Sequence, residues 1–289
     1  MPDVAAEVRI TEYTDPGCPW AWSAEPFRRR LQWLYGDSIE WRARMVGLSE
    51  SPEDYEKKGF TPETQAAAFA RISEDHGMPI DTSERPRMAA TLPACRAVVA
   101  AQLNAPERAR QLLRCLRVQN FSGALLDERE TIDSAASQVG LDSGELAGWM
   151  EQDTTESVLR EEMDAARQPI PAARVLDEKL AGWSGGRRYT CPSYEIERLA
   201  DGVRIAVPGF QPFSVYDVIL ANLVPGEERR DHAPGVEEVL RWAGTPLASQ
   251  EVAVLCQIDL HDAREQLGRV ATERHLGFDG LWTLSPADA

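Results

Sequence analysis

The chain has 289 residues, 43% of them hydrophobic, and a formal net charge of −16. This length allows one large domain or two to three small ones, with enough apolar residues to fill their cores. The acidity argues against nucleic acids and anionic membrane surfaces as partners, because both would repel such a surface. The sequence has no run of 18 uncharged apolar residues and no secretory pattern at its N-terminus, so we expect a cytoplasmic protein outside the membrane.

The first fifty residues are predicted to form a strand, a helix and a second strand. Apolar and polar residues alternate over 8–14 and again over 38–46, which is typical of strands. Between them, residues 24–34 place three large apolar side chains on one helical stripe. A helix between two strands allows these strands to run parallel, so this segment is a predicted βαβ unit.

A cysteine stands between the first strand and the helix, in the sequence Asp15-Pro16-Gly17-Cys18-Pro19-Trp20-Ala21-Trp22. At a helix N-terminus, unpaired N–H groups and the helix dipole favour a thiolate, and such thiols have a pKa of roughly 3.5–7.5. We therefore predict an ionised, accessible nucleophile at Cys18; the alternative is a small buried apolar residue. A redox dithiol would carry its second cysteine three residues later, where this chain has Ala21.

The middle of the chain is predicted to be all helical. Apolar residues recur there at helical spacing, in segments that cover 62–75, 92–103, 106–121, 131–139, 143–152 and 155–166. Thr61 and either Asp142 or Ser143 stand where N-cap residues are expected.

Strand patterns return near the end of the second hundred residues. Residues 193–198 and 203–207 are predicted strands, and Asp201-Gly202 between them is a hairpin signal. A helix over 214–223 follows. The next segment, 225–234, is charged and has no large apolar residue, so we predict a linker.

The last 55 residues, 235–289, are predicted to form a separate small domain. Helices over 236–242, 249–256 and 260–272 precede a short hairpin, which is the outline of a winged helix. Four arginines against nine acidic residues have the wrong sign for nucleic acid. We predict a surface for a protein partner or for a homodimer; a docked structural appendage is the alternative.

The order βαβ, helical block, ββα resembles the thioredoxin-like fold in its DsbA-like form. The resemblance covers about residues 7–223 and rests on the Cys18 motif and on Tyr189-Thr190-Cys191-Pro192-Ser193-Tyr194-Glu195-Ile196. The chain is most similar to cytoplasmic FrnE-type oxidoreductases, with kappa-class glutathione transferases and 2-hydroxychromene-2-carboxylate isomerases as relatives. The resemblance implies a cis peptide bond before Pro192, and it implies that the preceding residue, Cys191, faces the nucleophile's sulfur.

The predicted fold class is therefore α/β, a thioredoxin-like fold with an all-helical insertion and a small winged-helix-like C-terminal domain. The core comes from residues 1–50 and 175–224, and the insertion from 51–174. The linker covers 225–234 and the last domain 235–289.

The resemblance implies a thiol-disulfide oxidoreductase with Cys18 as its single motif nucleophile. Cys191 is a candidate resolving thiol, and its alternative is a packing residue that replaces the usual valine or threonine. The predicted substrate site consists of Pro19, Trp20, Ala21, Thr190 and Pro192, with Trp22 near the entrance or in ordinary packing. We expect a small thiol or disulfide as substrate and no tightly bound cofactor, with a low-molecular-weight thiol as co-substrate.

Two other function classes remain open. A transferase or isomerase that binds a small thiol would need cations for its carboxylates, and the candidates are Arg28, Arg187 and Arg188. A binding or regulatory protein on a degenerate scaffold is the non-enzymatic class, and Ala21 keeps it open.

The remaining cysteines and the histidines have structural interpretations. Five scattered cysteines indicate reduced thiols, and we expect Cys95, Cys115 and Cys256 in apolar cores. The four histidines have no spacing with cysteines that would indicate a zinc site, so no metal is expected.

Overall fold

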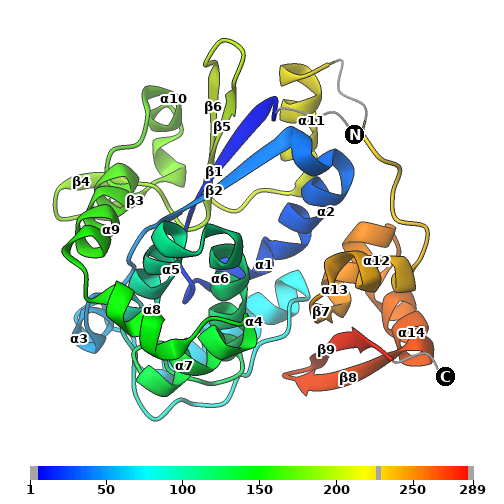
Figure 1. The fold of residues 1–289 in the computed structure, drawn as a ribbon, viewed down its shortest axis with the longest axis horizontal. Helices are drawn as coiled ribbons and strands as arrows, with labels where there is room; N and C mark the ends of the chain where they lie inside the picture. Colours follow the sequence, from blue (N-terminus) through cyan, green and yellow to red (C-terminus); the bar gives the residue numbers. More distant parts are fainter. Residues whose placement is uncertain (1–5, 226–228, 286–289) are drawn as a thin grey trace.

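A four-stranded sheet forms the centre of the molecule in the computed structural model, which describes residues 6–225 and 229–285 (Figure 1). Its strands are β1 (Val8–Thr14), β2 (Ile39–Met45), β5 (Ser193–Arg198) and β6 (Arg204–Pro208), in the order β2-β1-β5-β6. β1 runs parallel to β2, whereas the β1–β5 and β5–β6 pairs are antiparallel. All four predicted strands are confirmed, including the parallel pair.

The alternation along β1 decides what each face of the sheet contacts. Val8 and Ile10 belong to the apolar core under α2 (Glu25–Tyr35) and α11 (Phe213–Leu223). Because side chains two apart share a face, Glu12 also points to the α2 side, where it is fully buried. Tyr13 points to the opposite face and stacks on the ring of Tyr189, with 4.3 Å between ring centroids.

The helix predicted over 24–34 is preceded by a separate short helix. α1 (Pro19–Ser23) starts directly after Cys18, and α2 starts at Glu25. Pro26 lacks the N–H that would otherwise bond to the carbonyl of Trp22, so one continuous helix is interrupted there. Cys18 is therefore the N-cap of α1 and not of the longer α2.

The helical insertion has an apolar core of its own. The helices of the insertion are α3 (Pro52–Glu56), α4 (Pro62–His76), α5 (Leu92–Asn104), α6 (Pro106–Phe121), α7 (Arg129–Gln138), α8 (Ser143–Met150) and α9 (Asp153–Ala166). Thr61 and Asp142 accept hydrogen bonds from Thr64 N and Glu145 N, which confirms both predicted N-caps. Met45, at the end of β2, packs into this core and joins the insertion to the sheet.

Several short elements are absent from the sequence prediction. They are α3, α10 (Pro171–Arg174), the hairpin of β3 (Ala181–Trp183) and β4 (Gly186–Arg188), and the 3₁₀ turns η1 (Gly36–Ser38) and η2 (Asp177–Lys179). None of them exceeds five residues, which is too short for a helical or strand period to register. Within the described ranges, no helix has the length and apolar character needed to cross a bilayer.

The C-terminal unit comprises α12 (Val236–Ala243), β7 (Leu247–Ala248), α13 (Ser249–Cys256), α14 (Leu260–Val270), β8 (Ala271–Leu276) and β9 (Asp279–Leu284). The three helices and the hairpin are confirmed, and β7 completes a sheet of order β7-β9-β8. α14 ends at Val270, because 271–276 pairs with β9 instead of extending the helix. The winged-helix name for this unit stays a prediction.

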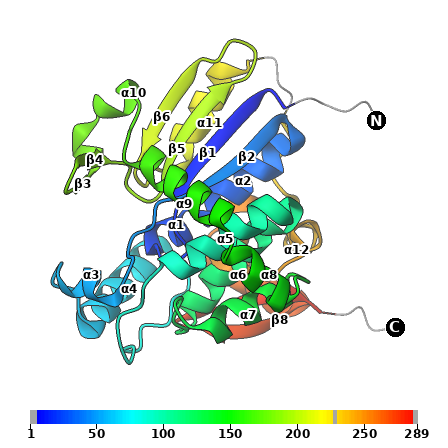
Figure 2. The same cartoon turned by 60° about the vertical axis from the view of Figure 1, so that its left-hand side comes forward.

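The C-terminal unit is docked on the rest of the chain (Figures 1 and 2). α13 packs along α2, and residues of both elements share one apolar core. The β8–β9 turn contains Gly277 at φ +59°, and a Cβ at this position would collide with the carbonyl of Ile80. The unit therefore contacts both the thioredoxin-like core and the helical insertion.

The predicted linker is held in place after residues 226–228, which lie outside the described residues. Arg230 N donates to Leu34 O at 2.8 Å, and Trp33 Nε1 donates to the carbonyl of Asp231 at 2.8 Å. Ala233 is buried in the shared core. The linker stays a prediction; its described residues are held by backbone hydrogen bonds and the small Ala233 side chain, in place of the large apolar anchor that the sequence does not contain.

Candidate functional site

The Cys18 motif and the loop that contains Pro192 meet in the structure. Cys18 Sγ donates a hydrogen bond to the carbonyl of Cys191 at 3.1 Å, although 173 positions separate them. The Cys191–Pro192 peptide bond is cis, as the resemblance implied. The residue before Pro192 therefore faces the sulfur of Cys18, which confirms that expectation.

Both cysteines are free thiols with different access to solvent. Cys18 is only 3% exposed, whereas Cys191 is half-buried. Burial raises the pKa of Cys191 well above its usual value, and a hydrogen bond with Cys18 and the charge at Cys18 act in the same direction. The expectation of an accessible Cys18 is wrong for this arrangement, because α1 and the Pro192 loop close over the sulfur.

A buried carboxylate holds the Cys18 motif in place. Asp15 Oδ1 accepts from Gly17 N at 2.8 Å, and Oδ2 accepts from Leu48 N and Thr91 Oγ1, each at 2.8 Å. Burial raises the pKa of Asp15 and these hydrogen bonds oppose the rise. Asp15 therefore joins the motif to the segment after β2 and to the start of α5. The sequence motif includes Asp15, but the motif alone predicts no role for this carboxylate.

The surroundings of the other three cysteines differ more from one another than expected. Cys95 is fully buried, as expected, but its Sγ donates to Asp15 Oδ2 at 3.4 Å instead of having only apolar neighbours. Cys256 is also buried. Cys115 is half-buried: it packs against the apolar core of the insertion, as expected, and it also lines a cavity.

The residues predicted to line the substrate site divide by exposure. Pro19, Trp20 and Thr190 are half-buried, whereas Ala21 and Pro192 are buried. The Trp20 ring lies 5.1 Å from His76 and 5.7 Å from Phe210, between centroids.

Trp22 has no place at an entrance. Its side chain is fully buried, stacks on Phe121 and donates from Nε1 to the carbonyl of Pro79 at 2.9 Å. Of the two interpretations of Trp22, ordinary packing is correct.

Tyr55, on the unpredicted helix α3, adds a residue to this site that sequence reasoning missed. Burial raises the pKa of its hydroxyl, and the charges of Asp15 and Cys18 act in the same direction. The aromatic residue is visible in the sequence, but its position within electrostatic range of Cys18 depends on how the insertion folds back.

The three arginines considered as cations for a small thiol are engaged within the chain. Arg28 donates to Glu25 and to Gln32, Arg187 pairs with Asp177, and Arg188 donates to the carbonyl of its neighbour Tyr189. These contacts give no support to an anion pocket beside Cys18.

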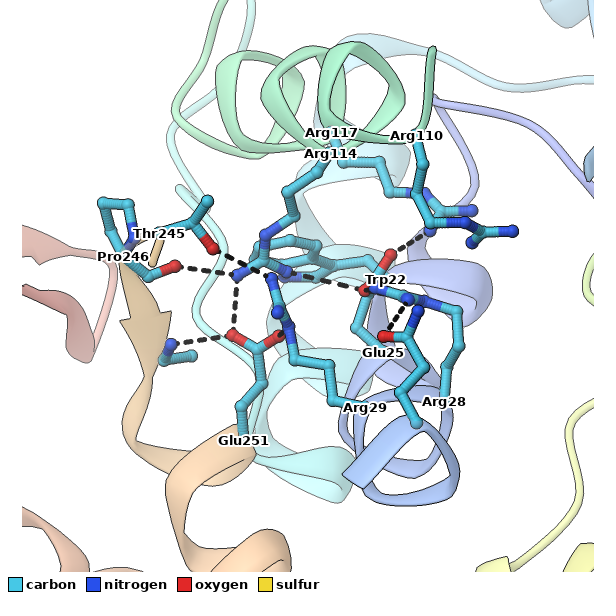
Figure 3. A network of polar contacts seen from close by, with 12 residues as sticks. Trp22, Glu25, Arg28, Arg29, Arg110, Arg114, Arg117, Thr245, Pro246 and Glu251 are labelled. Carbon is cyan, nitrogen blue, oxygen red and sulfur yellow. Dashed lines mark hydrogen bonds and ion pairs between the residues drawn. The ribbon is translucent and has the colours of Figure 1, made fainter. Parts of the chain in front are cut away.

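A second group of polar residues forms a buried ionic network between α6, α2 and β1 (Figure 3). Arg117 of α6 bonds to Glu12 of β1, to Glu25 of α2 and to Thr14. Burial alone would raise the pKa of Glu25, but the charges of Arg28 and Arg117 outweigh it and hold the pKa well below its usual value. The charges of Arg117, and of Arg110 beside it, likewise lower the pKa of Glu12 against its burial. Sequence reasoning missed this network because bonded members lie up to 222 positions apart.

The sequence model of the thioredoxin family matches residues 12–169, more than half of the chain. The chain belongs to the thioredoxin family. The matched segment contains the Cys18 motif, α1, α2, β2 and the helical insertion. The predicted family is thereby confirmed.

Solved structures identify the form of this thioredoxin fold. A probable DsbA oxidoreductase from Streptomyces coelicolor superposes with a TM-score of 0.55 at 17% identity and covers 78% of this chain and 94% of its own. The cytosolic disulfide reductase DsbM from Pseudomonas aeruginosa superposes with a TM-score of 0.54 at 17% identity, with 74% of this chain and 99% of its own covered. The fold of this thioredoxin is therefore DsbA-like. The relation to kappa-class glutathione transferases stays a prediction.

A relative by sequence extends further along the chain. The ClpXP adapter protein SpxH from Halalkalibacterium halodurans is 25% identical over 280 residues, which are 93% of this chain and 84% of that protein. An alignment of that length includes the C-terminal unit, which the thioredoxin family model leaves out.

Proposed function

We propose that this thioredoxin carries out thiol-disulfide exchange, with Cys18 and Cys191 as its redox pair. The observation that carries the proposal is the 3.1 Å hydrogen bond from Cys18 Sγ to Cys191 O, which brings both thiols to one loop junction. Ala21 removes the usual second cysteine, and in this proposal Cys191, whose carbonyl accepts from Cys18 Sγ, provides the second thiol.

The exchange proceeds in two steps. The Cys18 thiolate attacks one sulfur of a substrate disulfide, forms a mixed disulfide and releases the first substrate thiolate, which takes up a proton. Cys191, after losing its proton, attacks the Cys18 sulfur and releases the second substrate thiolate. Two electrons pass from the two protein thiols to the substrate, whose disulfide becomes two thiols. Two molecules of a low-molecular-weight thiol then reduce the Cys18–Cys191 disulfide and leave as their own disulfide.

Two structural features shape this proposal. The high pKa of Cys191 keeps it protonated while Cys18 makes the first attack, which separates the roles of nucleophile and resolving thiol. Because Cys18 is buried against α1 and the Pro192 loop, attack on a substrate requires local opening at this junction. Free thiols throughout the described chain favour the cytoplasm as the compartment.

The experiment is oxidation of the full chain with glutathione disulfide, followed by mass spectrometry of alkylated peptides. We expect a Cys18–Cys191 disulfide in the native chain. In Cys191→Ser we expect a trapped mixed disulfide on Cys18, and in Cys18→Ser a loss of turnover by at least a hundredfold. Cys115→Ser, which removes another half-buried thiol, is the matched control and should behave as the native chain. Full turnover in Cys18→Ser contradicts the proposal.

A second candidate is a regulatory binding protein that delivers substrates to ClpXP. It is favoured by the SpxH alignment, which runs through the C-terminal unit that the family model leaves out. The test is binding of the full chain to ClpX of the same organism by biolayer interferometry. The adapter hypothesis expects binding that the double variant Cys18→Ser/Cys191→Ser retains; absence of binding contradicts it.

A further inference from the structure

A cavity of about 550 Å³ lies where α2, α6 and the C-terminal unit meet, away from the Cys18 loop. Six arginines line it, and no acidic residue does so within the part of the chain that the structure describes; the arginines are Arg28, Arg29, Arg108, Arg110, Arg114 and Arg274. Figure 3 shows the four of these that reach into the ionic network, Arg28, Arg29, Arg110 and Arg114, gathered from α2 and α6. This concentration of cations runs against the net charge of −16.

The carboxylates beneath the cavity neutralise only part of this charge. Glu25 pairs with Arg28, and Glu251 pairs with Arg29 and Arg114. Glu12 completes the acidic members and lies 3.4 Å from Arg110. With Arg117 included, seven arginines stand against three glutamates, so the cluster carries an excess of four positive charges.

Two arginines at the cavity have no ion pair within the described residues. Arg108, in the first turn of α6, and Arg274, on β8, are both exposed. They approach the cavity from different units, one from the insertion and one from the C-terminal hairpin. Their guanidinium groups are therefore free to bind an anion from two sides.

The wall supplies further donors. Arg114 is nearly fully buried, and its Nε and Nη1 atoms have no hydrogen-bond partner in the described structure. The amides of Gln32, Gln111 and Gln138 also line the cavity. A buried donor without a partner destabilises the folded state, and a bound acceptor would offset this cost.

We propose that this cavity binds a small anion with two linked phosphate groups. Its volume lies within the range of small-molecule sites, about 300–1,000 Å³. Planar guanidinium groups match phosphate oxygens bidentately, and the charge excess of the cluster matches a diphosphate better than a monoanion. A nucleic-acid strand is disfavoured, because the net charge of −16 repels a long polyanion.

Such a ligand would bridge three parts of the fold. α2 belongs to the thioredoxin-like core, α6 to the insertion and Arg274 to the C-terminal unit. Binding to the folded state alone stabilises it by mass action, so the anion should raise the unfolding temperature. This inference is independent of thiol chemistry at Cys18.

The experiment is calorimetric titration of the full chain with inorganic pyrophosphate, together with thermal unfolding. We expect saturable binding of one pyrophosphate and a higher unfolding temperature. Orthophosphate and citrate should bind at least tenfold more weakly, and sodium chloride of equal ionic strength should leave the unfolding temperature unchanged. Arg108→Gln/Arg274→Gln should weaken pyrophosphate binding at least tenfold. Arg71→Gln, an exposed arginine on α4, is the control and should leave it unchanged.

A second readout uses the native chain only. Cys115 lines the cavity, so bound pyrophosphate should slow its alkylation several-fold, whereas alkylation of Cys191 should not change. An equal gain in unfolding temperature with sodium chloride, or unchanged binding in the double variant, overturns the proposal. Citrate binding as tight as that of pyrophosphate overturns the assignment to phosphate.

Discussion

Glu162 is a buried carboxylate whose charge opposes folding. It lies on α9, and its Oε2 accepts a hydrogen bond from Met45 N at 2.8 Å. Burial raises its pKa from 4.5 to about 7, against the opposing effects of that N–H and of Arg44. At a pH between these two pKa values, Glu162 is protonated in the folded chain and ionised in the unfolded chain. The contribution of Glu162 to stability is therefore present below pH 4.5 and is lost as the pH rises to 7.

We predict that Glu162→Gln stabilises the chain at pH 8 by about 1–3 kcal/mol, since one pKa unit corresponds to about 1.4 kcal/mol. The glutamine oxygen keeps the acceptor for Met45 N without the buried charge. The gain should shrink at pH 5, and urea unfolding at both pH values measures it. Glu161→Gln, exposed on the same helix, is the control. An equal gain at both pH values would refute the role of ionisation.

Individual residues also show where a sequence pattern is informative. Cys18, Pro192 and Cys191 were found from two short motifs, because the chemistry of a cysteine and the backbone demand of a proline are local. Asp15 and Tyr55 were visible as residue types. The hydrogen bonds of Asp15 to Leu48 and Thr91, and the position of Tyr55 within electrostatic range of Cys18, depend on segments that fold back from elsewhere in the chain, and no local pattern shows them.

At the scale of elements, one side chain ties helix α6 to the sheet. Arg117 is fully buried and connects α6 to Glu12 on β1 and Glu25 on α2. The lowered pKa values of both glutamates mean that this contribution is present above their unfolded pKa and is lost as the pH falls through the folded values. The network therefore favours folding at neutral pH and fails in acid.

Replacement of Arg117 by methionine should destabilise the chain by about 3–5 kcal/mol, because the buried Glu12 loses its main charge partner and the buried Glu25 loses one of its partners. Chemical unfolding at pH 7 measures the loss. Arg71→Met on the exposed face of α4 should cost less than about 0.5 kcal/mol. A loss of similar size in both variants would show that charge pairing at Arg117 is not the cause.

At the scale of the whole molecule, Glu251 joins three parts of the chain. Its carboxylate accepts from Arg29 Nε at 2.8 Å, from Arg114 Nη2 at 2.6 Å and from Ala248 N at 2.8 Å. Arg29 belongs to the thioredoxin-like core, Arg114 to the helical insertion and Glu251 to the C-terminal unit. The C-terminal unit is thereby fixed to both other parts, in addition to the apolar contact of α13 with α2.

The expected effect of Glu251→Ala is a loss of about 3–5 kcal/mol, since two buried guanidinium groups lose their shared partner. Hydrogen exchange should rise first in residues 236–284, because this unit depends most on the contact. Glu237→Ala, exposed on α12, should leave exchange unchanged. A uniform rise over the whole chain would argue against local loosening of the C-terminal unit.

The sequence by itself determined the long elements, their order, the family and the pair of motifs that contain Cys18 and Pro192. These features depend on local periodicity, on caps and on residue chemistry, all of which can be read within about fifteen positions. Tertiary structure alone decided the burial of Cys18, the anchoring of the segment around Asp231, the ionic network of Arg117 and the arginine-lined cavity. Each of these depends on which surfaces come into contact when segments far apart in the sequence pack together. No single stretch of sequence predicts these contacts.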